Sequence, residues 1–182
     1  DARDAVEAAR AGQRKWGDAT PTLRGQVLYR AAEMLEGRAD ECVEALKIGG
    51  TKTGPARREV AASVDRLVML AGWCDKIHQL LGCQNAVAGP YHNFTIPQPT
   101  GIVAVFCPDT PPLLSMVNLI GAALVGGNAV VAVIPPKAAL SAILFGEMLA
   151  VSDVPDGAVN LLTAAPRSLL EPIGGHREVS LI

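Results

Sequence analysis

The chain has 182 residues, of which 49% are hydrophobic and 19% charged, and its formal net charge is −2. This composition suits a globular protein with a core of its own. Aromatic residues are few and no basic block occurs, so a nucleic-acid partner is disfavoured.

Residues 1–81 are predicted to form a helical layer of three segments. The second segment begins at a Thr20 cap, breaks near residues 37–38 and ends at the two glycines 49–50. The third is predicted from about residue 55 to residue 81. The inward stripes contain Val6, Ala9, Gln13 and Trp16 in the first segment and Val60, Val64, Leu67, Leu70 and Ile77 in the third.

After Gly82 the pattern changes to extended and alternating segments. Residues 91–99 contain two prolines and are predicted to form an extended arm that fits an edge strand. From residue 101 to residue 182, apolar strand-like runs alternate with helical segments, which predicts right-handed βαβ units. The predicted fold class is therefore α/β, an N-terminal helical layer followed by a Rossmann-like parallel sheet.

The stretch from Thr110 to Pro136 contains no charged residue and is longer than the roughly 20 apolar residues that a membrane span needs. The sequence Gly126-Gly127-Asn128 interrupts it. We therefore expect a helix, a tight turn and a parallel strand that is covered on both faces. No membrane partner is predicted.

The four cysteines form no C-x-x-C pair and are accompanied by no histidine cluster. They are predicted to be reduced thiols of a cytoplasmic protein, and no metal site is expected. No G-x-G-x-x-G sequence follows a predicted strand, and no P-loop is present. The chain ends within EVSLI, a predicted buried strand, so we expect it to be a segment of a longer polypeptide.

The run PTGIVAVFCPDTPPLLSMVNLIGAALVGGNAVVAVIPPKAALSA, followed by DVPDGAVNLLT, resembles the N-terminal coenzyme-binding half of the aldehyde dehydrogenase superfamily. The upstream segments LRGQVLYRAAEMLEGRADE and ALKIGGTKTGPARREV fit the same family. The resemblance covers essentially residues 1–182. It implies the aldehyde dehydrogenase type of fold in a single coenzyme-domain segment.

Three positions depart from the pattern of this family. The family's P-W-N-F-P corresponds to residues 108–112, which places Thr110 where the family has the asparagine that binds the oxyanion of the thiohemiacetal. Losing one such donor costs about 2.7–4 kcal/mol of transition-state stabilisation. Val133 and Pro136 replace the family's lysine and glutamate, which reach the adenine ribose of NAD, and neither can supply the same polar contact. Lys137 lies one residue beyond and is not expected to substitute.

The resemblance thus defines a degenerate candidate site and leaves three hypotheses open. The candidate cofactor positions are Phe106, Cys107, Pro108, Asp109, Thr110, Val133 and Pro136. No catalytic residue is expected among them, and Cys107 is expected to be a small buried residue at the strand end.

The first hypothesis is a non-catalytic module, similar to the degenerate second module of the two-module family 16 aldehyde dehydrogenases. It would bind no cofactor, would pack on another aldehyde dehydrogenase module or a dimer partner, and would belong to a parent protein that uses NAD. The alternative is the coenzyme-binding segment of an active, divergent NAD(P)-dependent aldehyde dehydrogenase whose catalytic cysteine lies downstream. The third hypothesis is a Rossmann-like module that binds another ligand at CPDTPP.

Overall fold

The computed structural model describes residues 2–182. The helices that precede the sheet are α1 (Ala2–Asp18), α2 (Pro21–Gly37), α3 (Ala39–Ile48), α4 (Thr53–Trp73) and α5 (Ile77–Leu81). The predicted cap of α2 is confirmed, because Thr20 Oγ1 accepts a hydrogen bond from the Leu23 N–H at 3.2 Å. The break at residues 37–38 and the end before the glycines 49–50 are also as predicted.

A four-stranded parallel sheet with the order β3-β2-β1-β4 forms the second part of the chain. Its elements are β1 (Ile102–Phe106), α6 (Pro112–Val125), β2 (Ala129–Ile134), the 3-10 helix η1 (Pro136–Ala138), α7 (Ala139–Val151), β3 (Val159–Thr163), α8 (Pro166–Gly174) and β4 (Val179–Leu181). In the β1–β2 register Phe106 lies opposite Val133. This confirms the predicted alternation of strands and helices.

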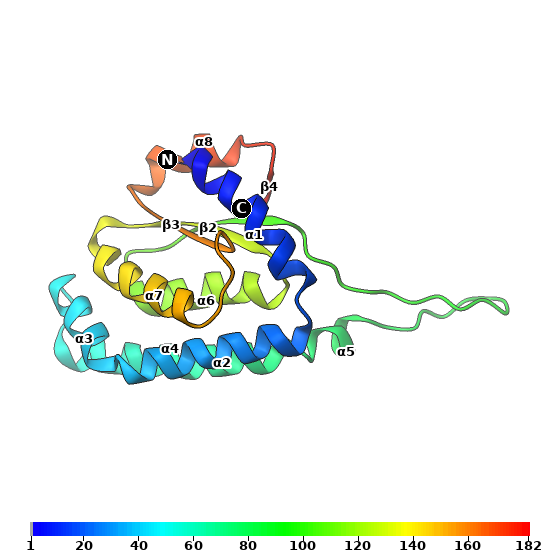
Figure 1. Ribbon diagram of the computed structural model, residues 1–182, viewed down its shortest axis with the longest axis horizontal. Helices are drawn as coiled ribbons and strands as arrows, with labels where there is room; N and C mark the ends of the chain where they lie inside the picture. Colours follow the sequence, from blue (N-terminus) through cyan, green and yellow to red (C-terminus); the bar gives the residue numbers. More distant parts are fainter. Residues whose placement is uncertain (1) are drawn as a thin grey trace.

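Helices cover both faces of the sheet (Figure 1). α1 and α8 pack on one face, α6 and α7 on the other, and α2 and α4 form an outer layer against α6. Along β2, Ala129, Val131 and Val133 face the α1–α8 side, and the residues between them face the α6–α7 side. All of β2 is buried, which explains why its sequence is continuously apolar.

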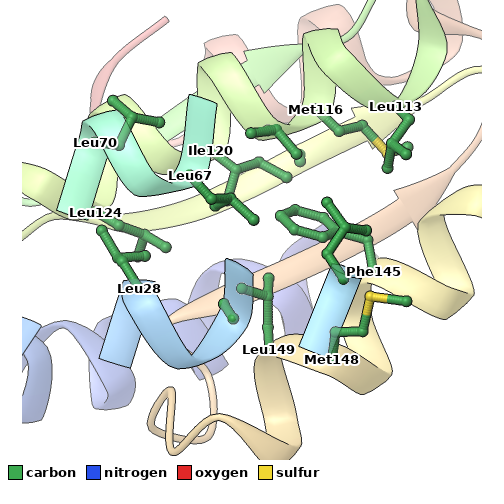
Figure 2. Packing of buried hydrophobic residues seen from close by; sticks show 14 of the residues in the cluster. Leu28, Leu67, Leu70, Leu113, Met116, Ile120, Leu124, Phe145, Met148 and Leu149 are labelled. Carbon is green, nitrogen blue, oxygen red and sulfur yellow. The ribbon is translucent and has the colours of Figure 1, made fainter. Parts of the chain in front are cut away.

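The larger part of the core lies between the sheet and the outer helices (Figure 2). There α6 is enclosed between β2 on one side and α4 on the other. The side chains that meet in this layer are Leu28, Leu67, Leu70, Leu113, Met116, Ile120, Leu124, Phe145, Met148 and Leu149. The charge-free run is thus helix α6, a turn at Gly127 (φ +79°) and strand β2. Among residues 2–182, no helix has the length and hydropathy needed to cross a bilayer.

Three expectations need correction. The predicted helix 55–81 is two helices, because the N–H groups of Cys74 and Lys76 bond three residues back and interrupt the α-helical ladder. Residues 91–99 are not an edge strand of the sheet: they extend away from the molecule (Figure 1) and pair with the residues that precede them through an antiparallel bridge between Gln84 and Phe94. The end of the chain is not a buried strand, since β4 is an edge strand and Leu181 is 54% exposed.

Helix α1 approaches the turn before β3 so closely that only glycines fit. A Cβ atom on Gly12 would lie 2.2 Å from the backbone nitrogen of Ala158, and one on Gly157 (φ +81°) would lie 2.3 Å from the carbonyl oxygen of Ala8. Real Cβ atoms do not approach backbone atoms to these distances. The contact therefore fixes the position of α1 on the sheet.

This contact makes Gly12 a sensitive position. We expect Gly12→Ala to lower the free energy of unfolding by about 3 kcal/mol, at the upper end of overpacking effects, because backbone must move. Gly37→Ala, where a Cβ atom meets nothing within 4 Å, is the matched control and should change stability by less than about 1 kcal/mol. Urea unfolding followed by circular dichroism measures both, and equal stability of the two variants would contradict the packing argument.

Candidate functional site

The candidate site is the turn that connects the carboxyl end of β1 to α6. The Cys107 N–H donates a hydrogen bond to the Val133 carbonyl at 2.9 Å, which prolongs the β1–β2 ladder by one residue. The chain then leaves the sheet, and the side chains of Pro108, Asp109 and Thr110 are exposed. The Thr110–Pro111 peptide bond is cis, and α6 begins at Pro112.

The structure brings the candidate residues to the carboxyl ends of two neighbouring strands, but in different environments. Phe106 is half-buried beside Val133 on the α1–α8 face. Val133 is 0% exposed, so its side chain belongs to the core. Pro136 follows β2 on the surface, as Asp109 and Thr110 follow β1.

Cys107 lies at the strand end and is buried, with 2% of its surface exposed. Burial raises the pKa of its thiol to about 11, because the thiolate would be removed from water. Burial likewise raises the pKa of Cys42 and of Cys74 to about 11. A thiol with such a pKa is almost wholly protonated at neutral pH and is a poor nucleophile.

The groups at this edge do not fit the adenine ribose of NAD in the way that the family resemblance implies. Ribose hydroxyls are bound by side chains that donate or accept hydrogen bonds. Val133 offers an enclosed apolar side chain and Pro136 an exposed ring without a donor. Among residues 2–182, no group of three or more histidine, cysteine, aspartate or glutamate side chains could hold a metal ion.

Glu59 is the residue of this region that the sequence analysis missed. It lies on α4, is only 9% exposed, and its Oε1 accepts hydrogen bonds from the N–H groups of Leu113 at 2.7 Å and Leu114 at 3.2 Å. These are N–H groups of the first turn of α6, which lack partners within the helix. Its spacing could have indicated its burial, because Glu59 lies on the same face of α4 as the buried residues Ser63 and Leu67.

The carboxylate of Glu59 therefore occupies the position that a phosphate takes at other helix N-termini. It supplies the capping acceptor that Pro111, the residue before α6, cannot provide. The amino end of α6 is consequently not open to an anionic ligand. The start of α6, where the turn 107–112 ends, is held by α4 through backbone N–H groups and not through the side chains of the turn.

Comparison with known proteins identifies the family to which this fold belongs. A sequence profile described as "Aldehyde dehydrogenase family" matches residues 1–182. The chain belongs to the aldehyde dehydrogenase family. The resemblance in the β1–α6–β2 segment is thereby confirmed, and the chain corresponds to the N-terminal domain of that family.

Among curated relatives, human "Cytosolic 10-formyltetrahydrofolate dehydrogenase" is 30% identical over 185 residues, which is 100% of this chain and 20% of the human protein. The chain thus spans about a fifth of that relative. A solved aldehyde dehydrogenase of Bacillus cereus (G224D mutant) superposes with a TM-score of 0.90 and 25% identity, over 96% of this chain and 36% of the other. An NAD-dependent benzaldehyde dehydrogenase of Corynebacterium glutamicum gives a TM-score of 0.88 and 25% identity, over 98% and 39% of the two chains.

The cap on α6 can be tested by substitution of Glu59. We expect Glu59→Ala to lower the free energy of unfolding by about 3 kcal/mol, since the buried N–H of Leu113 and the partly buried N–H of Leu114 lose a charged acceptor. Glu59→Gln keeps an acceptor oxygen and should cost about half as much. Glu36→Ala, at an exposed position on α2, is the control and should stay within about 0.5 kcal/mol of wild type. Thermal and urea unfolding measure the series, and a Glu59→Ala variant as stable as the control would refute the cap.

Proposed function

We propose that this chain is a non-catalytic module of an aldehyde dehydrogenase family protein and that it acts through its surfaces. The protein that contains it is proposed to be an oxidoreductase that converts aldehydes to carboxylic acids with NAD. The choice of NAD as coenzyme is supported by the structural neighbour from Corynebacterium glutamicum, which is an NAD-dependent benzaldehyde dehydrogenase. The module itself is proposed to bind no cofactor.

The observation that carries this proposal is the environment of Val133. Its side chain is fully enclosed on the α1–α8 face of the sheet, at the position where the resemblance implies a lysine that reaches the coenzyme. Pro136 and Thr110 replace two further polar groups of the same edge. The apolar framework remains intact while the groups that would bind coenzyme and oxyanion are replaced.

Coenzyme binding is the direct test. We expect calorimetric titration of NAD into the purified protein to give no saturable heat, because no polar side chain replaces the ribose contacts. The preparation should contain no companion module that binds NAD, and an NAD-competent aldehyde dehydrogenase domain serves as the positive control. Circular dichroism must show that the protein is folded. Binding of comparable strength to the control would exclude the proposal and favour a divergent active enzyme.

We propose that the module assembles with another aldehyde dehydrogenase module or a dimer partner through the predicted arm 91–99. Together with residues 83–90, with which it pairs, this segment is called the arm from here on. Its limbs are joined by the Gln84–Phe94 bridge and by backbone bonds from Asn85 to Asn93 and from Thr95 to Cys83. A two-stranded pair of this kind is marginally stable alone in water. Several large apolar side chains of the arm are exposed, namely Val87, Tyr91, Phe94 and Ile96. Pairing with a further strand would cover them.

If the arm is the contact of the assembly, a substitution in it should weaken association without changing the stability of the module. We expect Ile96→Asp, at a position 58% exposed, to raise the dissociation constant of the assembly at least tenfold, since a charge would enter the new contact. The unfolding midpoint should not change, because Ile96 contributes little to the core. Val68→Asp, on the exposed side of α4, is the control. Analytical ultracentrifugation measures both, and an assembly unaffected by Ile96→Asp would rule out the arm as its contact.

A further inference from the structure

A second apolar surface lies between α3 and α7, at the opposite end of the molecule from the arm (Figure 1). It is a cavity of about 500 Å³ open to solvent, called here the α3–α7 groove. Its lining residues are Asp40, Glu41, Glu44, Ala45, Ile48, Leu140, Ile143 and Leu144. The groove is formed by two helices that already pack on each other, so its shape is set by the fold.

The floor of the groove is apolar and uncovered. Ile48 is 72% exposed, Ile143 57% and Leu140 44%. Single exposed apolar side chains are ordinary, but three that face one cavity from two helices form a patch of the kind that marks interaction sites.

The rim of the groove is acidic. Asp40, Glu41 and Glu44 line it, and no lysine or arginine is among the lining residues. Two cations of α3 and its start neutralise part of this charge: Lys47 pairs with Glu44 at 2.7 Å, and Arg38 pairs with Glu41 at 2.7 Å and with Glu147 at 2.9 Å. With Asp40, which is also on the rim, these four carboxylates and two cations leave the rim with a net negative charge. Asp65 and Glu36 add negative charge on the other side of α3, where they line a neighbouring cavity with Arg57.

We propose that the α3–α7 groove binds a basic amphipathic helix of a partner protein. The apolar face of such a helix would cover Ile48, Leu140 and Ile143, and its flanking lysine or arginine side chains would meet the carboxylates of α3. Helix-in-groove recognition uses anchors at positions i, i+3, i+4 and i+7. The length of α3, ten residues or about 15 Å, matches the span of about three turns of a bound helix.

This interaction is independent of coenzyme binding and of arm pairing. The groove contains none of the candidate cofactor positions, and the arm extends from the other end of the molecule (Figure 1). If the module binds NAD, or if the arm is not an assembly contact, the groove can still bind a helix. Failure of peptide binding at the groove would likewise not affect those two proposals.

The probe for the test is a fluorescein-labelled peptide of 14 residues, composed only of leucine and lysine with the leucines on one helical face. We expect saturable one-to-one binding to the purified protein by fluorescence anisotropy. The affinity should fall as the salt concentration rises, because the attraction between lysines and carboxylates is screened. A peptide with glutamate in place of every lysine should bind at least tenfold more weakly.

Variants on one helix locate the binding. Ile143→Asp should weaken the leucine–lysine peptide at least tenfold, whereas Val151→Asp, at an exposed position of the same helix outside the groove, should bind like wild type. Asp40→Asn should weaken binding about threefold and reduce its salt dependence. Thermal unfolding checks that all variants are folded.

Three results would overturn the proposal. The first is the absence of saturable binding, and the second is equal affinity of the Ile143→Asp and Val151→Asp variants for the peptide. The third is self-association of the wild-type protein that Ile143→Asp abolishes and Val151→Asp does not, since the groove would then be occupied by a second copy of this chain.

Discussion

The structure depends on the burial of a helix without charges and on the hydrogen bonds that its two ends then require. α6 lies between the sheet and the outer helices, so much of it is removed from water, and protein groups bond the N–H groups at its start and a carbonyl near its end. Glu59 of α4 accepts from the first turn, and Trp16 of α1 donates its Nε1–H to the Leu124 carbonyl at 2.9 Å. One central helix thereby fixes α1, α4 and the sheet relative to one another.

The same arrangement explains how the β1–α6 turn can keep its geometry whatever side chains occupy its exposed positions. Its geometry comes from the ladder bond of Cys107 and from Glu59, neither of which involves the side chains of Asp109 or Thr110. Substitutions at the exposed positions of the turn therefore cost little stability. A domain of this fold can lose its coenzyme contacts and still keep its architecture, which is the situation that we propose for this chain.

The sequence predicted those parts of the fold that local patterns determine. The cap at Thr20, the glycine turn before β2 and the continuous apolar strand β2 each reflect a rule that acts over a few residues. Long-range partners were not predictable in this way. Glu59 contacts Leu113 across 54 positions, and the pairing of Gln84 with Phe94 follows from the path of the arm. For the candidate site, the sequence indicated which residues follow the ends of β1 and β2. It did not indicate that Val133 is completely buried, because that burial depends on α1 and α8, which lie near the two ends of the chain.

A module that has lost its own chemistry can be retained if it connects other parts of an assembly. The arm and the α3–α7 groove lie at the two ends of the longest axis of the molecule (Figure 1), so a partner at one would not obstruct a partner at the other. The two surfaces also differ in chemistry: the arm offers strand edges with exposed apolar side chains, and the groove offers an apolar floor with a carboxylate rim. Contacts of such different kinds select different partners, because a strand pairs through its backbone and a basic helix requires the acidic rim. The rigid packing around α6 would hold the two contacts at a fixed distance, which is the property that a connecting module needs.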